Sequence, residues 1–132
     1  MKKINIPNED AINIGSFFLR VACALMLVHG WKKLSNFSEM SANFEDPLHV
    51  GNTVSLALTV FAEFFCTIFV VAGLFTRIAL LPLIFSFIVI IFVVHAHDPF
   101  KDREAALMYL LIYLATFYVG PGKYSLDNLL RK

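Results

Sequence analysis

Hydrophobic positions dominate four stretches of the chain, at residues 11–30, 54–74, 78–94 and 104–119. A helix needs about 20 apolar residues to cross a hydrocarbon core of roughly 30 Å, and each stretch approaches that length. The third stretch is apolar on every side apart from Ser86, unlike the alternating strands of a membrane β-barrel. The pattern therefore predicts an all-α integral membrane protein, a four-helix bundle that forms a single transmembrane domain over residues 1–132.

The composition agrees with a membrane protein, because 58% of the residues are hydrophobic and only 16% are charged. A formal net charge of +1, without a run of five or six like charges, argues against nucleic acid as a partner. Cys23 and Cys66 lie inside apolar stretches without C-x-x-C spacing, which indicates neither a dithiol redox centre nor a zinc ribbon. Membrane lipid is the partner that the composition predicts.

Lysine and arginine residues outside the stretches predict the orientation of the chain. Six lie on the side of both termini and four on the other side: Lys2, Lys3, Arg77, Lys123, Arg131 and Lys132 against Lys32, Lys33, Lys101 and Arg103. Because cytoplasmic segments are enriched in positive charge, we expect both termini in the cytoplasm. The expected location is the bacterial inner (plasma) membrane, which the chain crosses several times.

Two charges interrupt the first two stretches, and each is the tenth residue of its stretch: Arg20 and Glu63. Antiparallel packing would bring both near the bilayer midplane, where an unpaired charge costs about 2.5 to 3.5 kcal/mol. We therefore predict an Arg20–Glu63 ion pair. It would either fix the register of the helices and do nothing else, or form a polar pocket for a ligand head group or a proton.

All four histidines are expected on the side opposite the termini: His29, His49, His95 and His97. The H-x-H spacing of the last two brings both rings to one metal only in an extended segment, so we predict no metal site. His29 and His95 end their stretches at the same membrane face, where a neutral imidazole can hydrogen-bond a quinone head group. Tyr109 can donate a similar bond, although a packed core tyrosine is the alternative.

In combination, these residues form a pattern that resembles the DoxX family of small bacterial membrane proteins, over about residues 14–130. The matching pieces are Arg20, the H-G-x-x-K-L of residues 29–34, Glu63, the G-L-F-T-R of residues 73–77, His95 and the G-P-G-x-x-S-L-D of residues 120–127. One departure is Ala105, where relatives often have tyrosine after the glutamate. The resemblance implies four membrane helices and, for some relatives, membership of quinone-linked oxidoreductases such as thiosulfate:quinone oxidoreductase.

Two hypotheses follow for the function. The first is a quinone-interacting membrane subunit of an oxidoreductase complex, whose ligand-binding residues are Arg20, His29, Glu63, His95 and Tyr109. Since the sequence contains no redox centre, electron transfer would need a bound quinone or a partner oxidoreductase subunit; a second copy of the chain is the other partner considered. The second hypothesis is a non-catalytic membrane scaffold or small-solute carrier with a structural Arg20–Glu63 pair. Whether the chain is itself an enzyme stays open.

Overall fold

The protein is all-helical over residues 8–131, the part of the chain that the computed structural model describes. Its helices are α1 (Asn8–Cys23), α2 (Met26–Ser35), α3 (Phe37–Ser41), α4 (Asn52–Val60), α5 (Thr67–Ala72), α6 (Thr76–Val89), α7 (Phe100–Val119) and α8 (Leu126–Leu130), with π-helical turns η1 (Phe61–Cys66) and η2 (Ile90–Val94). This confirms the predicted fold class. Lys2, Lys3 and Lys132, which the predicted orientation used, lie outside the described residues.

Three helical runs are long and apolar enough to cross a membrane: Asn8–Ser35, Asn52–Ala72 and Thr76–Val94. The first, of 28 residues, extends beyond its predicted stretch at both ends. Acidic residues in its first turn and lysines in its last turn complement the helix dipole, so the helix continues through these polar positions.

The fourth crossing stays a prediction. α7 has 20 residues, about 30 Å of helix, but its first turns carry four charges: Lys101, Asp102, Arg103 and Glu104. It nevertheless packs along α6 and α1 as the last long helix of the bundle.

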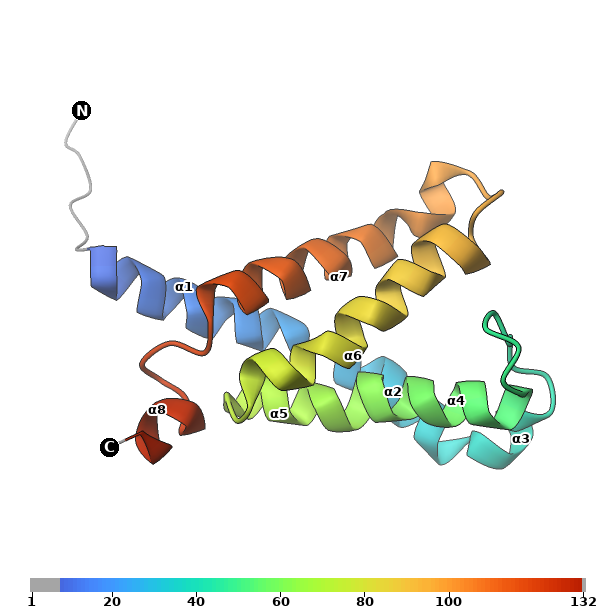
Figure 1. Cartoon of the computed structure of the whole chain (residues 1–132), viewed down its shortest axis with the longest axis horizontal. Helices are drawn as coiled ribbons and strands as arrows, with labels where there is room; N and C mark the ends of the chain where they lie inside the picture. Colours follow the sequence, from blue (N-terminus) through green and yellow to red (C-terminus); the bar gives the residue numbers. More distant parts are fainter. Residues whose placement is uncertain (1–7, 132) are drawn as a thin grey trace.

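The helices close around one end of the bundle and separate toward the other. α1 packs against α5 and α7, whereas α2 packs against η1 and α4. Figure 1 shows α6 and α7 leading away from α2, α3 and α4 on the side opposite α8. We call the end that carries α8 the tail end and the separated end the cavity end. α1 begins at the tail end too (Figure 1).

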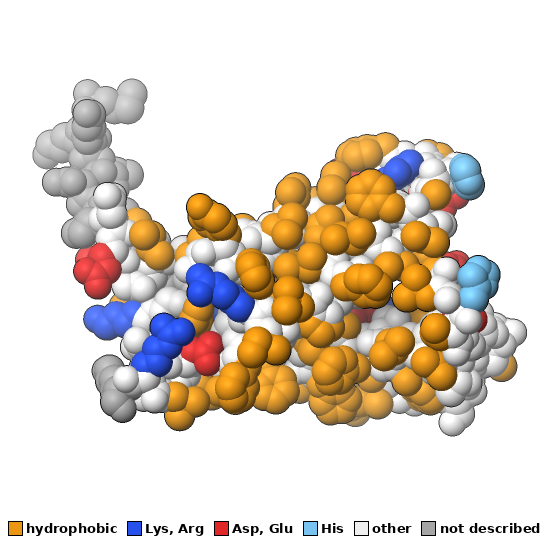
Figure 2. Space-filling view, viewed as in Figure 1, with side chains coloured by type: hydrophobic (Ala, Val, Ile, Leu, Met, Phe, Trp, Pro, Cys, Tyr) orange, Lys and Arg blue, Asp and Glu red, His pale blue; other side chains and the backbone are white. Residues whose placement is uncertain are grey.

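The surface between the two ends is apolar. Large side chains such as Phe18, Val28, Ile78 and Phe92 are more than half exposed on the outside of the bundle. Figure 2 shows hydrophobic atoms over most of the middle of the visible face, while charged and histidine side chains gather mainly toward its ends. Such a surface suits contact with lipid chains, and the protein is a membrane protein.

Candidate functional site

Arg20 is buried at the tail end and binds backbone carbonyls. Its guanidinium donates to the oxygen of Val71, at 2.7 Å, and to the oxygen of Tyr124. The predicted Arg20–Glu63 ion pair is therefore wrong. The cause is helix register: Gly30, not Arg20, lies against Glu63, and the helix between residues 20 and 30 spans about 15 Å. The Arg20 charge is stabilised instead by carbonyls beside the C-terminal end of α5.

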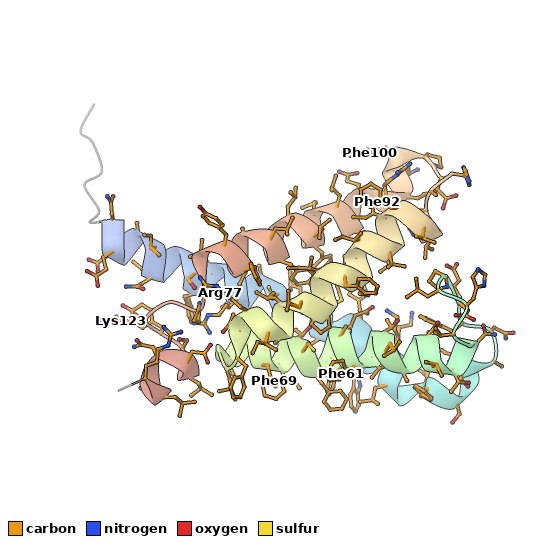
Figure 3. All side chains as sticks on the ribbon, in the orientation of Figure 1. Phe61, Phe69, Arg77, Phe92, Phe100 and Lys123 are labelled. Carbon is orange, nitrogen blue, oxygen red and sulfur yellow. The ribbon has the colours of Figure 1, made fainter. Side chains whose placement is uncertain are left out.

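The G-L-F-T-R and G-P-G-x-x-S-L-D segments meet at the same tail end. The Asp127 carboxylate accepts hydrogen bonds from the backbone N–H of Phe75 and Thr76, at 2.8 and 3.1 Å, and from the Thr76 hydroxyl. Arg77 donates to the carbonyl of Phe117 at 2.9 Å, near the C-terminal end of α7. Figure 3 shows Arg77 and Lys123 at this end of the molecule. These contacts bind the turn before α6 to α8, and the first turn of α6 to the last turn of α7.

Glycine and serine residues complete this tail-end network. Gly73 has φ of +73°, and a Cβ there would collide with Ser125. The Ser125 hydroxyl accepts a hydrogen bond from Asn128 N–H at 3.2 Å and so caps α8. Ser16, fully buried in α1, donates to the carbonyl of Gly120 at 2.6 Å. Motif residues at the tail end therefore close the bundle.

A cavity of about 690 Å³ occupies the cavity end. Its walls are α4 and η1 on one side and α6 and η2 on the other, and residues 43–50 form part of its lining. Apolar side chains predominate in the walls, among them Leu58, Phe61, Phe85 and Val89. A cavity of this size and character is typical of a site for an apolar small molecule.

Glu63 lines this cavity and pairs with Lys33 rather than with Arg20. The Lys33 Nζ lies 2.5 Å from Glu63 Oε1, and the two side chains are 21% and 3% exposed. Gly30 allows this contact because it has no Cβ: a Cβ at residue 30 would lie 2.8 Å from backbone atoms of Glu63 and Phe64. α2 thus approaches η1 closely, and Lys33 follows one helical turn after Gly30. The charge pattern predicts Lys33 outside the membrane-spanning stretch; its G-x-x-K spacing from Gly30, within the H-G-x-x-K-L motif, is the signal for its contact with Glu63.

His95 ends η2 and also lines the cavity. Its Nδ1 lies 2.7 Å from Oδ2 of Asp98, in the loop before α7. Glu63 and His95 are the two predicted site residues that line the cavity. Glu63 belongs to the π-helical turn η1, and His95 directly follows η2. Such turns are frequent at functional sites because the extra residue re-aims the side chains that follow.

His29 and Tyr109 lie outside the cavity lining, in an aromatic cluster. Their rings meet edge to face with centroids 6.4 Å apart. Tyr109 also contacts Phe87 and stacks on Tyr113, with centroids 5.6 and 6.1 Å away. The structure thus separates the five predicted ligand-binding residues into three places, and a ligand role for His29 or Tyr109 stays a prediction.

The loop over the cavity is held by Asp46. Its carboxylate accepts hydrogen bonds from the N–H groups of Val50 and Gly51 and from the Ser55 hydroxyl, at 2.8 to 2.9 Å. Desolvation raises the pKa of the Asp46 carboxyl, but the bonds from Ser55, Gly51 and Val50 outweigh it, so the pKa is below its usual value. The carboxylate therefore stays ionised and fixes the loop to the start of α4.

Together, the fold and the cavity define a small helical membrane protein with a mainly apolar cavity between its helices. The model of the DoxX family matches residues 15–96, which is more than half of the chain, and the protein belongs to the DoxX family. The matched region includes Arg20, Lys33, Glu63 and His95 but not the segment after α7. No curated protein and no solved structure matches the chain.

Proposed function

We propose that the protein binds a quinone in the cavity and serves as the quinone-interacting membrane subunit of an oxidoreductase. The observation that carries this proposal is a cavity of about 690 Å³ with apolar walls and a few polar side chains, Lys33, Glu63 and His95 among them. Quinone sites need this combination, because the ring and tail are apolar while the two ring oxygens need hydrogen-bond partners.

Access from the membrane supports the proposal. Phe61 of η1 and Phe85 of α6 both line the cavity, and they are 51% and 58% exposed on the apolar surface of the bundle. The cavity thus opens between two membrane-crossing helices. A head group can occupy the cavity through such an opening while its isoprenoid tail remains in lipid.

The polar groups of the cavity suit a head group that exchanges protons. Glu63 is nearly sealed from solvent, whereas Asp98, which binds His95, is 46% exposed. His95 is therefore the link between the cavity and water at the cavity end, and imidazole transfers protons near neutral pH. Reduction or oxidation of a quinone moves electrons as well, so a partner oxidoreductase subunit supplies or accepts the electrons in this proposal.

A titration with a quinone analogue tests the proposal on the purified full chain in lipid nanodiscs. Ser86 lines the cavity from α6, so Ser86→Phe should fill part of it and weaken binding about tenfold or more. Ile88→Phe is the matched control, because Ile88 is on the same helix, 41% exposed and outside the cavity lining. Its affinity should equal that of the wild type.

Mass spectrometry of lipophilic molecules extracted from the purified protein gives a second readout, with a quinone as the expected finding. Absence of binding by the wild type would overturn the proposal and favour the non-catalytic scaffold. Equal weakening by both phenylalanine variants would place the quinone elsewhere on the bundle.

A further inference from the structure

The hydrogen bond between His95 and Asp98 determines which His95 nitrogen remains for a ligand. An ionised carboxylate can only accept, so Nδ1 of His95 carries the hydrogen that bridges the 2.7 Å to Asp98 Oδ2. In a neutral imidazole the other nitrogen, Nε2, is then an acceptor. His95 lines the cavity and Asp98 does not. With a neutral ring, the atom that His95 offers to a ligand is therefore a hydrogen-bond acceptor.

Glu63 offers a second acceptor. Lys33 occupies its Oε1, and within residues 8–131 the other oxygen, Oε2, has no hydrogen-bond donor. The Glu63 side chain is only 3% exposed, so Oε2 is largely desolvated. Since Glu63 lines the cavity, this free carboxylate oxygen is accessible from it. A desolvated carboxylate oxygen without a donor is costly, and a ligand that donates to it removes that cost.

We infer that the cavity recognises the reduced, dihydroxy form of the quinone, the quinol, more strongly than the oxidised form. This inference rests on the proposed function. A quinol carries two hydroxyl groups, which can donate to Glu63 Oε2 and to His95 Nε2. A quinone carries two carbonyl oxygens, which accept only and would leave both protein acceptors unpaired.

The Lys33 ammonium does not reverse this preference. It has donors beyond the one used by Glu63, and either form of the ligand can accept from them. A hydroxyl beside the Lys33–Glu63 pair accepts from Nζ and donates to Oε2, so it satisfies both partners. A carbonyl in the same place satisfies Lys33 alone and sets its oxygen against a carboxylate oxygen. The Lys33–Glu63 pair therefore favours the quinol over the quinone, as His95 does.

The test compares one short-tailed benzoquinone with the same molecule reduced to the quinol, under anaerobic conditions. Isothermal titration of the full chain in nanodiscs gives both dissociation constants without any electron transfer. We expect the quinol to bind about tenfold or more tightly. Asp98→Asn should narrow this ratio several-fold, because an amide can donate to Nδ1 and so no longer keeps Nε2 an acceptor. His95→Phe should narrow it too, while the ring volume is retained.

Asp102→Asn is the matched control: it removes a similar exposed carboxylate in the first turn of α7, outside the cavity lining, and should leave the ratio unchanged. A wild type that binds both forms equally, or the quinone more tightly, would overturn the inference while the proposed function stands. An unchanged ratio in both Asp98→Asn and His95→Phe would also overturn it. Failure of both forms to bind the wild type would overturn the proposed function itself.

Discussion

At the tail end Arg20 and Asp127 bind the backbone of other elements, whereas at the cavity end Lys33 and Glu63 bind each other. Arg20 donates to the carbonyls of Val71 and Tyr124, and Asp127 accepts from the N–H groups of Phe75 and Thr76. Lys33 and Glu63, by contrast, form a side-chain pair in the wall of a cavity. The difference indicates that contacts at the tail end hold the helices together, and it supports the proposed ligand site at the cavity end.

The motif residues that resemble the DoxX family therefore have different roles at the two ends of the bundle. Arg20, residues 73–77 and residues 120–127 meet at the tail end and hold the helices together. Gly30, Lys33, Glu63 and His95 are at the cavity end. A bundle whose helices separate at one end loses packing there, so contacts at the other end must supply more of its stability. Variants at the two ends should therefore separate stability from binding.

The largest expected effect is at the tail end. Arg20→Met removes both guanidinium hydrogen bonds and leaves two carbonyls with a lost donor, which should cost about 3 kcal/mol of unfolding free energy. Thermal or denaturant unfolding in micelles, followed by helical circular dichroism, measures the loss. Arg131→Met, at the exposed end of α8, is the control and should be within about 0.5 kcal/mol of the wild type. A stable Arg20→Met that no longer binds a quinone would contradict the division between the two ends.

The next effect comes from close approach at the cavity end. In Gly30→Ala the new methyl would lie 2.8 Å from backbone atoms of Glu63 and Phe64, so α2 and η1 must move apart. Such overpacking should cost about 2 kcal/mol and lengthen the Lys33–Glu63 contact. Gly15→Ala, in α1 of the same crossing, meets nothing within 4 Å and should be neutral or slightly stabilising. Equal stabilities of the two variants in thermal unfolding would rule out the close packing of α2 on η1.

The fold could be predicted from the sequence because hydrophobic length alone identifies membrane helices, and Arg20, Glu63 and His95 could be singled out as polar residues at or near the apolar spans. The residues that these side chains contact could not be predicted. Counting from the start of each apolar stretch placed Arg20 and Glu63 at one depth, but the first helix begins at Asn8 and its register follows the contact of Gly30 with Glu63. Backbone contacts of this kind leave little trace in hydropathy.

The π-helical turns are a second reason why the contacts of these residues could not be predicted from the sequence. Facing residues are inferred from a period of 3.6 residues per turn, and a turn with an extra residue rotates every side chain after it. Glu63 lies inside η1 and His95 follows η2, so spacing rules fail where the cavity forms. The contact of Lys33 with Glu63 could not be predicted, because a lysine at a helix end usually faces water. Only the spacing of Lys33 from Gly30 in the sequence indicated it.

A smaller effect is expected from the ion pair itself. Glu63→Gln leaves the Lys33 ammonium without its anion and should cost about 1 to 2 kcal/mol, less than for a dry pair because Lys33 is 21% exposed to the cavity. Combining it with Lys33→Met should recover much of this loss in a double-mutant cycle of unfolding free energies. Additive losses would mean that the two side chains do not interact, and the cavity would then lack its charged pair.

The smallest effect concerns pH and returns to the tail end. Partial burial raises the pKa of Asp127, but hydrogen bonds from Thr76 and Phe75 and the charge of Arg131 outweigh it, so the folded-state pKa is lowered. A lowered carboxyl pKa contributes stability that is complete above the unfolded value, about 4, and is lost as the pH falls through the folded value.

As the pH falls below about 4, protonation of Asp127 should therefore lower the unfolding free energy of the wild type by about 0.5 to 1 kcal/mol. Asp127→Asn should lack this loss, because its side chain cannot titrate there. Parallel denaturant titrations of the two proteins between about pH 3 and pH 7 measure the difference. Glu39→Gln, on the exposed face of α3 at the cavity end, is the control and should follow the wild type across the range. Curves of wild type and Asp127→Asn that stay parallel would show that Asp127 does not fasten the tail end.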